Sequence, residues 1–234
     1  MKTKLINKEY ELFNKLSEEW WDENGKFKIL HKIRPIRIKY ILDQTSGENI
    51  KNLDVLDLGC GGGLVSESLC RLGANVTAID FVKNNIDAAK HHSNNNKLKI
   101  NYECANIEKL EIKNKYDLII MYEILEHLDD WETFLLKISK NLKEKGILVI
   151  STINRNILSK LAAIYLAENL LAWIPKGTHN YKKFIKPNEI KRCLESKNLM
   201  LKDITGLVFN PIDMSWNLSD NTSINYFCSY NKFN

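Results

Sequence analysis

The spacing of hydrophobic and polar residues changes several times along the chain, and these changes predict alternating strands and helices. Short apolar runs predict strands over residues 54–58, 75–80, 99–104, 116–122 and 146–152. The segments between them predict helices over residues 63–72, 83–95 and 131–142. Because strands that alternate with helices pair in parallel through right-handed crossovers, the pattern predicts a doubly wound, Rossmann-like α/β sheet.

The two ends of the chain depart from this alternation. Apolar side chains at helical spacing over residues 7–22 predict an amphipathic helix. Pro35 is expected to begin a second helix that ends near Leu42, because a missing N–H costs nothing in a first helical turn. Residues 1–45 are therefore predicted to form an N-terminal helical cap.

After the fifth strand, a helix over 187–197 and strands over 200–209 and 224–230 are expected to complete a sheet of seven strands. The chain contains no internal repeat and no low-complexity linker. We therefore expect residues 1–234 to form a single domain.

Residues 156–174 form a long, mostly apolar segment that contains only Lys160 and Glu168 as charges. They predict a helical insertion over 156–186 at the rim of the sheet, where substrates enter such folds. Several lysines follow the apolar stretch, and that composition is typical of a helix lying on an anionic membrane surface. The alternative is a lid helix buried against the core.

Composition narrows the class of protein. The net charge is only +5, with 34 basic and 29 acidic residues interleaved, so a nucleic-acid partner is not expected. The five cysteines form no Cys-x-x-Cys pair, which argues against a zinc site and suits a reducing compartment. No uncharged apolar run reaches the roughly 18 residues of a membrane-spanning helix. We therefore expect a cytoplasmic protein that reaches a membrane at most by its surface.

A glycine-rich segment, residues 57–63 (Asp-Leu-Gly-Cys-Gly-Gly-Gly), follows the first strand. Glycines at such a turn let the backbone approach a ligand closely. Leu64 occupies the position of the third glycine in the dinucleotide pattern, which disfavours an NAD-dependent enzyme. The turn instead resembles the first motif of the class I S-adenosylmethionine methyltransferases, and the resemblance implies a cofactor site that includes Asp57, Gly59 and Gly61.

Two further polar residues follow the next strands. Asp80 ends the second strand, where a carboxylate can accept both ribose hydroxyls of a nucleoside. The alternative is a structural turn with Asp80 as a helix cap. Asn106 follows the third strand, where these enzymes usually bind the adenine amino group, although a loop asparagine is also common turn chemistry.

The flanking segments resemble the UbiG-type O-methyltransferases of ubiquinone biosynthesis over nearly the whole chain. The similar segments are residues 20–22, 27–30, 31–41, 56–63, 123–127, 151–156, 175–179 (Pro-Lys-Gly-Thr-His), 182–187 (Lys-Lys-Phe-Ile-Lys-Pro), 205–207 and 210–211. The resemblance implies a class I methyltransferase fold and methylation of polyprenylated catechol and demethylubiquinol hydroxyls at two steps of the pathway. It also implies a place on the inner face of the membrane and in a quinone-biosynthesis complex.

Matching the family's motifs assigns roles to individual residues. Arg37 would contact the carboxylate of the cofactor, Gly59 and Asp80 would hold the cofactor, and Tyr122 would lie beside its adenosine. A guanidinium suits that task because it pairs with a carboxylate through two parallel hydrogen bonds. The chain departs from the family at Arg34, where asparagine is expected, and at Tyr122, where a smaller or unbranched apolar residue is common.

Glu123, Glu126 and His127 follow the fourth strand at the edge of the sheet where ligands bind. Their spacing is expected to place all three on one side of a single helical turn. In one interpretation they bind Mg²⁺, which would acidify the substrate hydroxyl. In a second, His127 is the general base and a neighbouring carboxylate such as Glu126 orients it. In a third, Glu126 and His127 only brace a loop.

Two alternatives from outside this family stay open. One is a class I methyltransferase that acts on another small-molecule hydroxyl. The other is a cofactor-binding module without catalysis. The intact set of Arg37, Asp80, Glu123, Glu126 and His127 argues against the second alternative.

Overall fold

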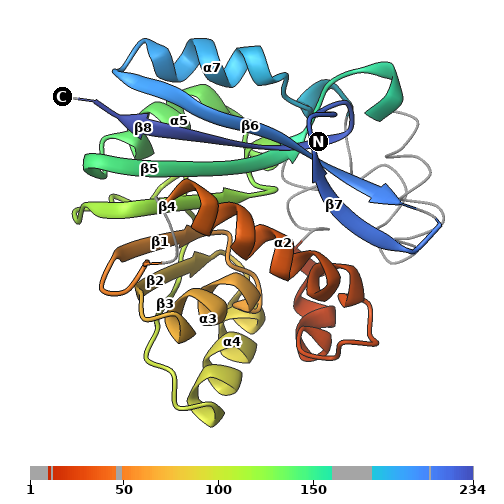
Figure 1. Ribbon diagram of the computed structural model, residues 1–234. Coiled ribbons are helices and arrows are strands. Elements are labelled where there is room, and N and C mark those ends of the chain that lie inside the picture. Colours follow the sequence, from red (N-terminus) through yellow and green to blue (C-terminus); the bar gives the residue numbers. More distant parts are fainter. Residues whose placement is uncertain (1–9, 12, 46–48, 160–180, 211, 234) are drawn as a thin grey trace.

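The computed structural model describes residues 10–11, 13–45, 49–159, 181–210 and 212–233. These residues form one central sheet with helices on both of its faces (Figure 1). The strands are β1 Asp54–Leu58, β2 Asn75–Asp80, β3 Asn101–Cys104, β4 Tyr116–Tyr122, β5 Leu142–Ile153, β6 Leu199–Asn210, β7 Ser215–Ser219 and β8 Asn225–Lys232. The α-helices are α2 Lys28–Gln44, α3 Leu64–Arg71, α4 Lys83–Asn95, α5 Trp131–Ser139 and α7 Pro187–Glu195. Short 3-10 turns form η1 Ser17–Glu19, η2 Leu125–His127 and η4 Tyr181–Lys183.

The strand order is β3-β2-β1-β4-β5-β8-β6-β7. Strands β1 to β5 pair in parallel, whereas β8 is antiparallel to β5 and β6 is antiparallel to β8. The order reverses at β1, which lies between β2 and β4. In such sheets ligands bind beyond the carboxyl ends of the strands at the point of reversal, so the end of β1 is where a site is expected.

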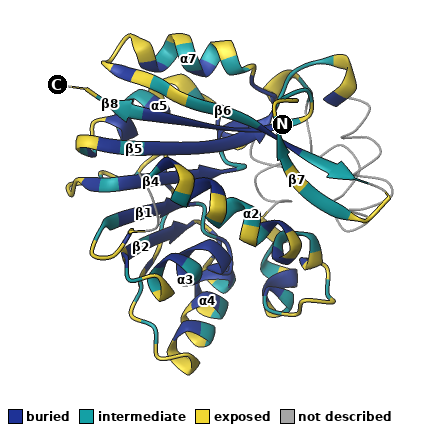
Figure 2. Ribbon diagram, in the orientation of Figure 1, coloured by how far each residue is buried: buried dark blue, intermediate teal, exposed yellow. Residues whose placement is uncertain are grey.

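The central strands are buried along most of their length, as their dark blue colour in Figure 2 shows, and alternate residues belong to apolar clusters on opposite faces of the sheet. On one face, Leu56 and Ile119 pack with apolar residues of α5 and α7. On the other face, Val55 and Ile120 pack with residues of α2, α3 and α4. Burial on both sides explains why these strands read as nearly continuous apolar runs in the sequence.

The described sheet has eight strands, where the sequence pattern predicted seven. The additional strand, β7, pairs only with β6 and forms the edge of the sheet. All five of its residues are exposed or half-buried, so it lacks the apolar signal of a core strand. Strand β5 likewise begins four residues earlier than predicted. Its first residues include Lys143, Glu144 and Lys145, and these polar side chains gave no apolar signal in the sequence.

The expected helix start at Pro35 is wrong, because α2 begins at Lys28 and continues through the proline. A proline inside a helix removes one backbone hydrogen bond and costs about 3 kcal/mol. Burial of Ile33, Tyr40 and Ile41 against the sheet offsets that cost. Of the predicted first helix, residues 10–11 and 13–16 are helical, residues 7–9 and 12 lie outside the described residues, and the chain then tightens into η1.

The predicted insertion over 156–186 lies mostly outside the described residues, which resume at Tyr181. None of the helices described on either side of it has the length and apolar character needed to cross a membrane.

Candidate functional site

The glycine turn connects β1 to α3 at the carboxyl edge of the sheet. Gly59, Gly61 and Gly63 have φ angles of +71°, +53° and +85°, in the left-handed region that favours glycine. The N–H of Gly59 donates to the carbonyl of Ile79 at 2.7 Å, which ties the turn to the end of β2. Three residues with left-handed backbone within five positions favour glycine at these positions, even before any ligand contact is considered.

The missing side chains also make room for the protein's own residues. A Cβ atom added at Gly61 or Gly62 would lie 2.5 or 2.3 Å from the indole of Trp20. A Cβ atom at Gly59 would lie 1.8 Å from Cδ1 of Ile124. The sequence suggested that glycines were needed for a ligand to approach, and the structure adds close contact with an N-terminal tryptophan as a second reason.

Asp80 ends β2 and is only 6% exposed. Its Oδ2 accepts the N–H of Gly61 at 3.0 Å, and its Oδ1 accepts the N–H of Val82 at 2.8 Å and the amide of Asn85 at 3.3 Å. Burial raises the pKa of this carboxyl, and hydrogen bonds from Val82, Gly61, Asn85 and the backbone of Phe81 oppose that shift. Oδ2 accepts only the Gly61 N–H among the three bonds described above, so this oxygen is the one better able to accept a ligand hydroxyl.

Asp57 lies beside Asp80 at the end of β1 and is also buried. Its Oδ2 accepts the hydroxyl of Ser66 from α3. Burial raises its pKa to about 6, the Ser66 bond and the charge of Arg37 lower it, and the charge of Asp80 raises it again. Two buried acidic groups around one turn create a negative region that suits a cationic ligand.

Arg37 projects from α2 toward the same edge, with its side chain 11% exposed. Its guanidinium lies 5.0 Å from the ring centroid of Tyr122, and its Nη2 lies 4.0 Å from Oε1 of Glu123. The Tyr122 hydroxyl donates to the carbonyl of Arg37 at 3.2 Å, which joins α2 to the end of β4. The buried Nε of Arg37 has no hydrogen-bond partner among the described residues, so a donor is left for a ligand carboxylate.

Asn106 follows β3 and is exposed. Its side-chain oxygen accepts the N–H of Glu108 at 3.0 Å, which is the turn chemistry that the sequence left as an alternative. The neighbouring Ala105 donates its N–H to the carbonyl of Asp80 at 3.0 Å and so brings this turn to the end of β2. Asn106 therefore lies near the other predicted cofactor residues, and its carbonyl oxygen still has a second lone pair.

Two glutamates after β4 are held by consecutive hydroxyl residues of β5. Ser151 donates to Oε1 of Glu123, and Thr152 donates to Oε2 of Glu126, both at 2.8 Å. Glu126 is only 4% exposed, and its Oε1 has no hydrogen-bond partner among the described residues. Burial, followed by the charge of Glu123, raises the pKa of Glu126 to about 8, while His127 lowers it. Sequence reasoning did not identify Ser151 and Thr152, although adjacent hydroxyls at a strand end were a usable signal.

The predicted single helical turn of Glu123, Glu126 and His127 is wrong. Glu123 has a φ of +55° and so cannot belong to the turn, which begins as η2 at Leu125. Glu126 then points into the core, whereas His127 is exposed and its carbonyl accepts the Nζ of Lys183 at 3.2 Å. In the described part of the chain, no three His, Cys, Asp or Glu side chains are grouped so that they could hold a metal ion.

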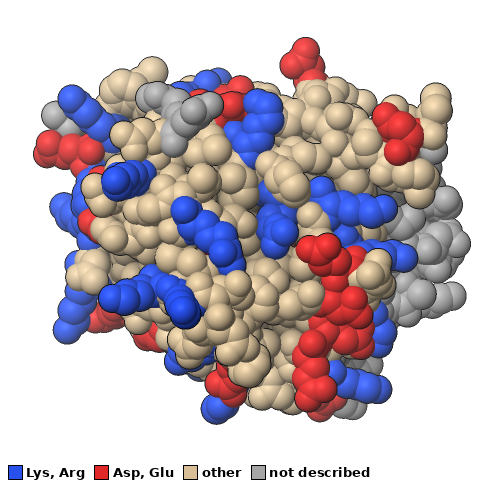
Figure 3. Space-filling view, turned by 60° about the horizontal axis from the view of Figure 1, so that its bottom comes forward, with Lys and Arg blue, Asp and Glu red and all other residues tan. Residues whose placement is uncertain are grey.

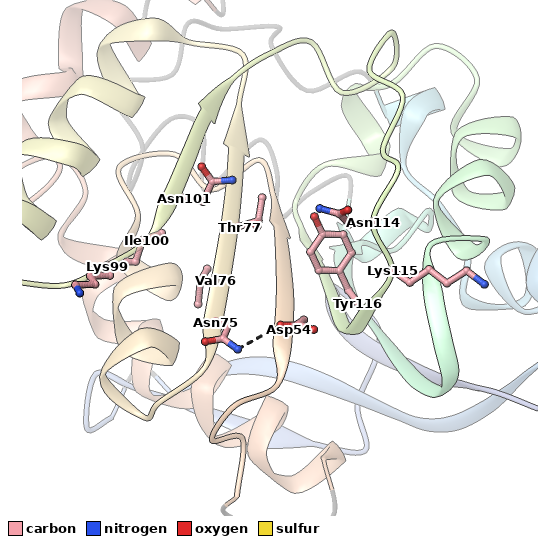
Figure 4. A pocket seen from close by; sticks show the side chains of 10 residues that line it. All are labelled: Asp54, Asn75, Val76, Thr77, Lys99, Ile100, Asn101, Asn114, Lys115 and Tyr116. Carbon is pink, nitrogen blue, oxygen red and sulfur yellow. Dashed lines mark hydrogen bonds between the residues drawn. The ribbon is translucent and has the colours of Figure 1, made fainter.

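A cavity of about 660 Å³ lies at the amino ends of the parallel strands, away from the glycine turn (Figure 4). Its lining includes the first residues of four strands, Asp54, Asn75, Asn101 and Tyr116. The amide of Asn75 donates to Asp54 at 3.3 Å within it. Because ligands of such sheets bind at the carboxyl ends of the strands, this cavity is not the candidate site.

Surface charge adds little to the site. Figure 3 shows one face on which basic side chains are spread among uncharged ones, while acidic side chains form a band along one side. The displayed face therefore has no continuous basic surface.

Comparisons with known proteins show which family the chain resembles. Residues 56–150 match the model of a family described as "Methyltransferase domain". The ubiquinone biosynthesis O-methyltransferase of Pelagibacter ubique (strain HTCC1062) is 47% identical to the chain, over 97% of the chain and 98% of its own length. The enzyme of the same name from Rickettsia prowazekii (strain Madrid E) is 44% identical, over 98% of the chain and 92% of its own length.

Solved structures share the fold at much lower identity. The magnesium protoporphyrin IX methyltransferase of Synechocystis PCC 6803 with bound SAH has a TM-score of 0.64 and 17% identity, and the match covers 88% of this chain and 85% of that one. An S-adenosylmethionine-dependent methyltransferase from Clostridium acetobutylicum ATCC 824 has a TM-score of 0.61 and 18% identity, covering 88% and 98%. The expected class I methyltransferase fold is therefore confirmed, with β7 as an additional edge strand.

Proposed function

Because the chain belongs to the family of ubiquinone biosynthesis O-methyltransferases, we propose that it methylates hydroxyls of polyprenylated catechol and demethylubiquinol intermediates at both O-methylation steps of that pathway. The protein is an S-adenosylmethionine-dependent O-methyltransferase that acts in ubiquinone biosynthesis. The proposal rests on one observation: enzymes of that name are 44–47% identical to the chain over nearly its full length. The two steps and their acceptors are the part that we propose.

The cofactor is assigned to the carboxyl ends of β1, β2 and β4. In this assignment Gly59 and Gly61 lie under the methionine portion, and Asp80 accepts a ribose hydroxyl with Oδ2. The unpartnered Nε of Arg37 supports its role toward the methionine carboxylate. Asp57 contributes negative charge near the sulfonium, and Asn106 and Tyr122 border the adenosine.

Methyl transfer is an in-line displacement, in which the acceptor oxygen bonds to the methyl carbon while the carbon–sulfur bond breaks. The bonding electrons stay on sulfur and give S-adenosylhomocysteine. Holding the two reactants in line can contribute roughly 7–11 kcal/mol.

The acceptor hydroxyl must also lose its proton, since a phenol has a pKa of about 10. Glu126, with its pKa raised to about 8 and one oxygen without a partner, is well matched to accept that proton. His127 is a second candidate for this role, because a ring nitrogen of a neutral imidazole can accept a proton.

Mg²⁺ is a further candidate for activating the hydroxyl, since it is usually held by one or two carboxylates and water. The paired carboxylates Glu123 and Glu126 fit that donor set, whereas the exposed His127 does not. When bound there, the ion would lower the pKa of the acceptor hydroxyl.

Removal of divalent metal tests this assignment. Dialysis against EDTA is expected to lower turnover about tenfold or more, with recovery on addition of Mg²⁺, because the carboxylate pair would lose its counterion. Binding of S-adenosylhomocysteine, measured by calorimetry, should be unchanged and so controls for damage to the fold. Turnover that is insensitive to EDTA would contradict a role for the metal, and the proton would then be accepted by a side chain of the protein.

The substrate assignment is tested with purified protein, labelled S-adenosylmethionine and two short-chain acceptors, a polyprenyl catechol and a demethylubiquinol. Label in both products supports action at both steps. Methylation of only one acceptor would reduce the proposal to that step. Methylation of neither, with soluble phenols accepted, would favour another small-molecule hydroxyl as the substrate.

A polyprenylated acceptor lies in a bilayer, and we assign contact with the inner face of the membrane to the apolar segment 157–174. Most of that segment lies outside the described residues, but Ile157 and Leu158 at its start are 75% and 59% exposed. Apolar side chains next to a lysine-rich stretch suit an anionic surface, and a quinone-biosynthesis complex would assemble there. Deleting residues 161–174 should abolish flotation with anionic vesicles while cofactor binding persists, and continued flotation would refute the assignment.

A further inference from the structure

Two consecutive tryptophans of the N-terminal segment lie on the glycine turn. The indole N–H of Trp21 donates to the carbonyl of Gly62 at 3.1 Å. The ring of Trp20 lies directly against Gly61 and Gly62, where any added Cβ would clash with it. These contacts join residues about 40 positions apart and place the N-terminal cap on the backbone of the candidate cofactor site.

Trp20 also reaches Asp80 through one intermediate residue. Its indole N–H donates to Oδ1 of Asn85 at 2.8 Å. Because an indole can only donate, the Asn85 atom facing it is the oxygen, which leaves the NH₂ group to face Asp80. The NH₂ group donates to Oδ1 of Asp80 at 3.3 Å. All three side chains are buried, so the orientation of the Asn85 amide is set by this pair of bonds.

The indole of Trp20 is itself held in place by neighbouring residues of the N-terminal segment and α2. It stacks on Phe27 with ring centroids 3.9 Å apart and an interplanar angle of 6°. The carbonyl of Trp20 is 2.8 Å from Nε2 of His31, at the start of α2. Little conformational entropy is therefore left to lose at Trp20 when the cofactor binds.

We propose that Trp20 is a positioning residue of the cofactor site, which acts through Asn85 on the Asp80 carboxylate. The proposal rests on the assignment of Asp80 to the cofactor ribose. Without the indole N–H, the Asn85 amide is free to rotate and to turn its oxygen toward Asp80, where two acceptors repel each other. The carboxylate keeps its bonds to the N–H groups of Gly61 and Val82 but exchanges the Asn85 donor for a repelling acceptor, so the cofactor binds more weakly while the reacting groups stay unchanged.

A conservative substitution separates this role from packing. Trp20→Phe keeps an aromatic ring in the stack with Phe27 but removes the N–H. We expect it to weaken binding of S-adenosylhomocysteine, measured by calorimetry, by about 5- to 20-fold. The KM for S-adenosylmethionine should rise in parallel, and kcat at saturating cofactor should stay within about twofold. Trp216→Phe, which changes an indole on the edge strand β7 and outside the contacts of Trp20 with the glycine turn and Asn85, is the matched control and should bind normally.

Coupling to Asn85 supplies the decisive measurement. If Trp20 acts through Asn85, then Asn85→Ala alone should give a similar loss, and the double variant should bind no worse than Asn85→Ala. Losses that add, an unchanged affinity of Trp20→Phe, or tighter binding would each overturn the proposal. If Trp20→Phe does not fold, Asn85→Ala and Asn85→Asp still test the chain of contacts, because unchanged affinity in both would also overturn it.

The same experiment separates failure of the premise from failure of the inference. An Asp80→Asn variant that binds S-adenosylhomocysteine as well as the parent chain overturns the ribose assignment itself. Weakened binding in Asp80→Asn together with normal binding in Trp20→Phe overturns only the role of Trp20.

Discussion

Replacing Glu126 by glutamine is expected to lower turnover by about 10²- to 10⁴-fold, the usual contribution of a positioned acid or base. Glutamine has nearly the same shape, and its oxygen can still accept the hydroxyl of Thr152, so the local packing should persist. It cannot take a proton from the acceptor, and it supplies no charge to a metal ion. Activity should therefore be lost whether the carboxylate takes the proton itself or holds a metal ion, whereas His127 as the base would leave turnover largely intact.

The same substitution should make the folded chain more stable at alkaline pH. The pKa of Glu126 is about 8 when folded, against an ordinary value of 4.5. Between these values the folded state holds a proton that the unfolded state lacks, so the stability of the wild type falls as pH rises from 4.5 to 8. Glutamine does not ionise and escapes this loss. At pH 8.5 the Tm of Glu126→Gln should exceed that of the wild type by roughly 3–8 °C, and at pH 4.5 the two should nearly agree.

Thermal melts at the two pH values, together with single-turnover rates, check both halves of this expectation. Glu144→Gln changes an exposed glutamate at the start of β5 and should alter neither quantity. In the wild type, kcat/KM should rise with pH through about 8, because the carboxyl must be ionised to act. Full activity in Glu126→Gln would reduce this glutamate to a brace of the loop after β4.

Asp80→Asn is expected to weaken binding of S-adenosylhomocysteine by 100-fold or more. The carboxylate accepts N–H groups of Gly61 and Val82 on its two oxygens, and an amide can accept only one of them. The other N–H would face an NH₂ group in a buried place, which disturbs the glycine turn and costs about 1–3 kcal/mol. The bond to the ribose hydroxyl also loses the strength that a charged acceptor provides.

Isothermal calorimetry with S-adenosylhomocysteine measures this loss directly. Asp87→Asn is the matched control, because Asp87 lies on α4 only seven positions away but forms an exposed ion pair with Lys83. A circular-dichroism spectrum and a Tm near those of the parent chain would show that the sheet is intact. If Asp80→Asn keeps its affinity, the cofactor does not depend on the end of β2 and the assigned site is wrong.

Several elements were predictable to the residue from sequence, among them β1, β2, α4 and β4. Their signal is local, because burial on both faces of a central strand needs a run of apolar residues whatever the rest of the chain does. The glycine turn was predictable for a similar reason, since a left-handed backbone needs glycine at fixed positions, and the cofactor was implied by the resemblance of that turn to the first motif of the class I methyltransferases. Strand β7 and the course of α2 through Pro35 were not, because an edge strand buries little and packing can override a local helix breaker.

The sequence by itself determined the parallel α/β sheet, the glycine turn after β1 and the acidic residues at the ends of β1 and β2. Tertiary structure alone decided that Trp20 lies on that turn and reaches Asp80 through Asn85. It also decided that Glu126 is buried against Thr152 while the adjacent His127 is exposed. The physical reason is that backbone conformation is set by neighbouring residues, whereas burial, hydrogen-bond partners and pKa depend on side chains that folding brings together from distant parts of the chain.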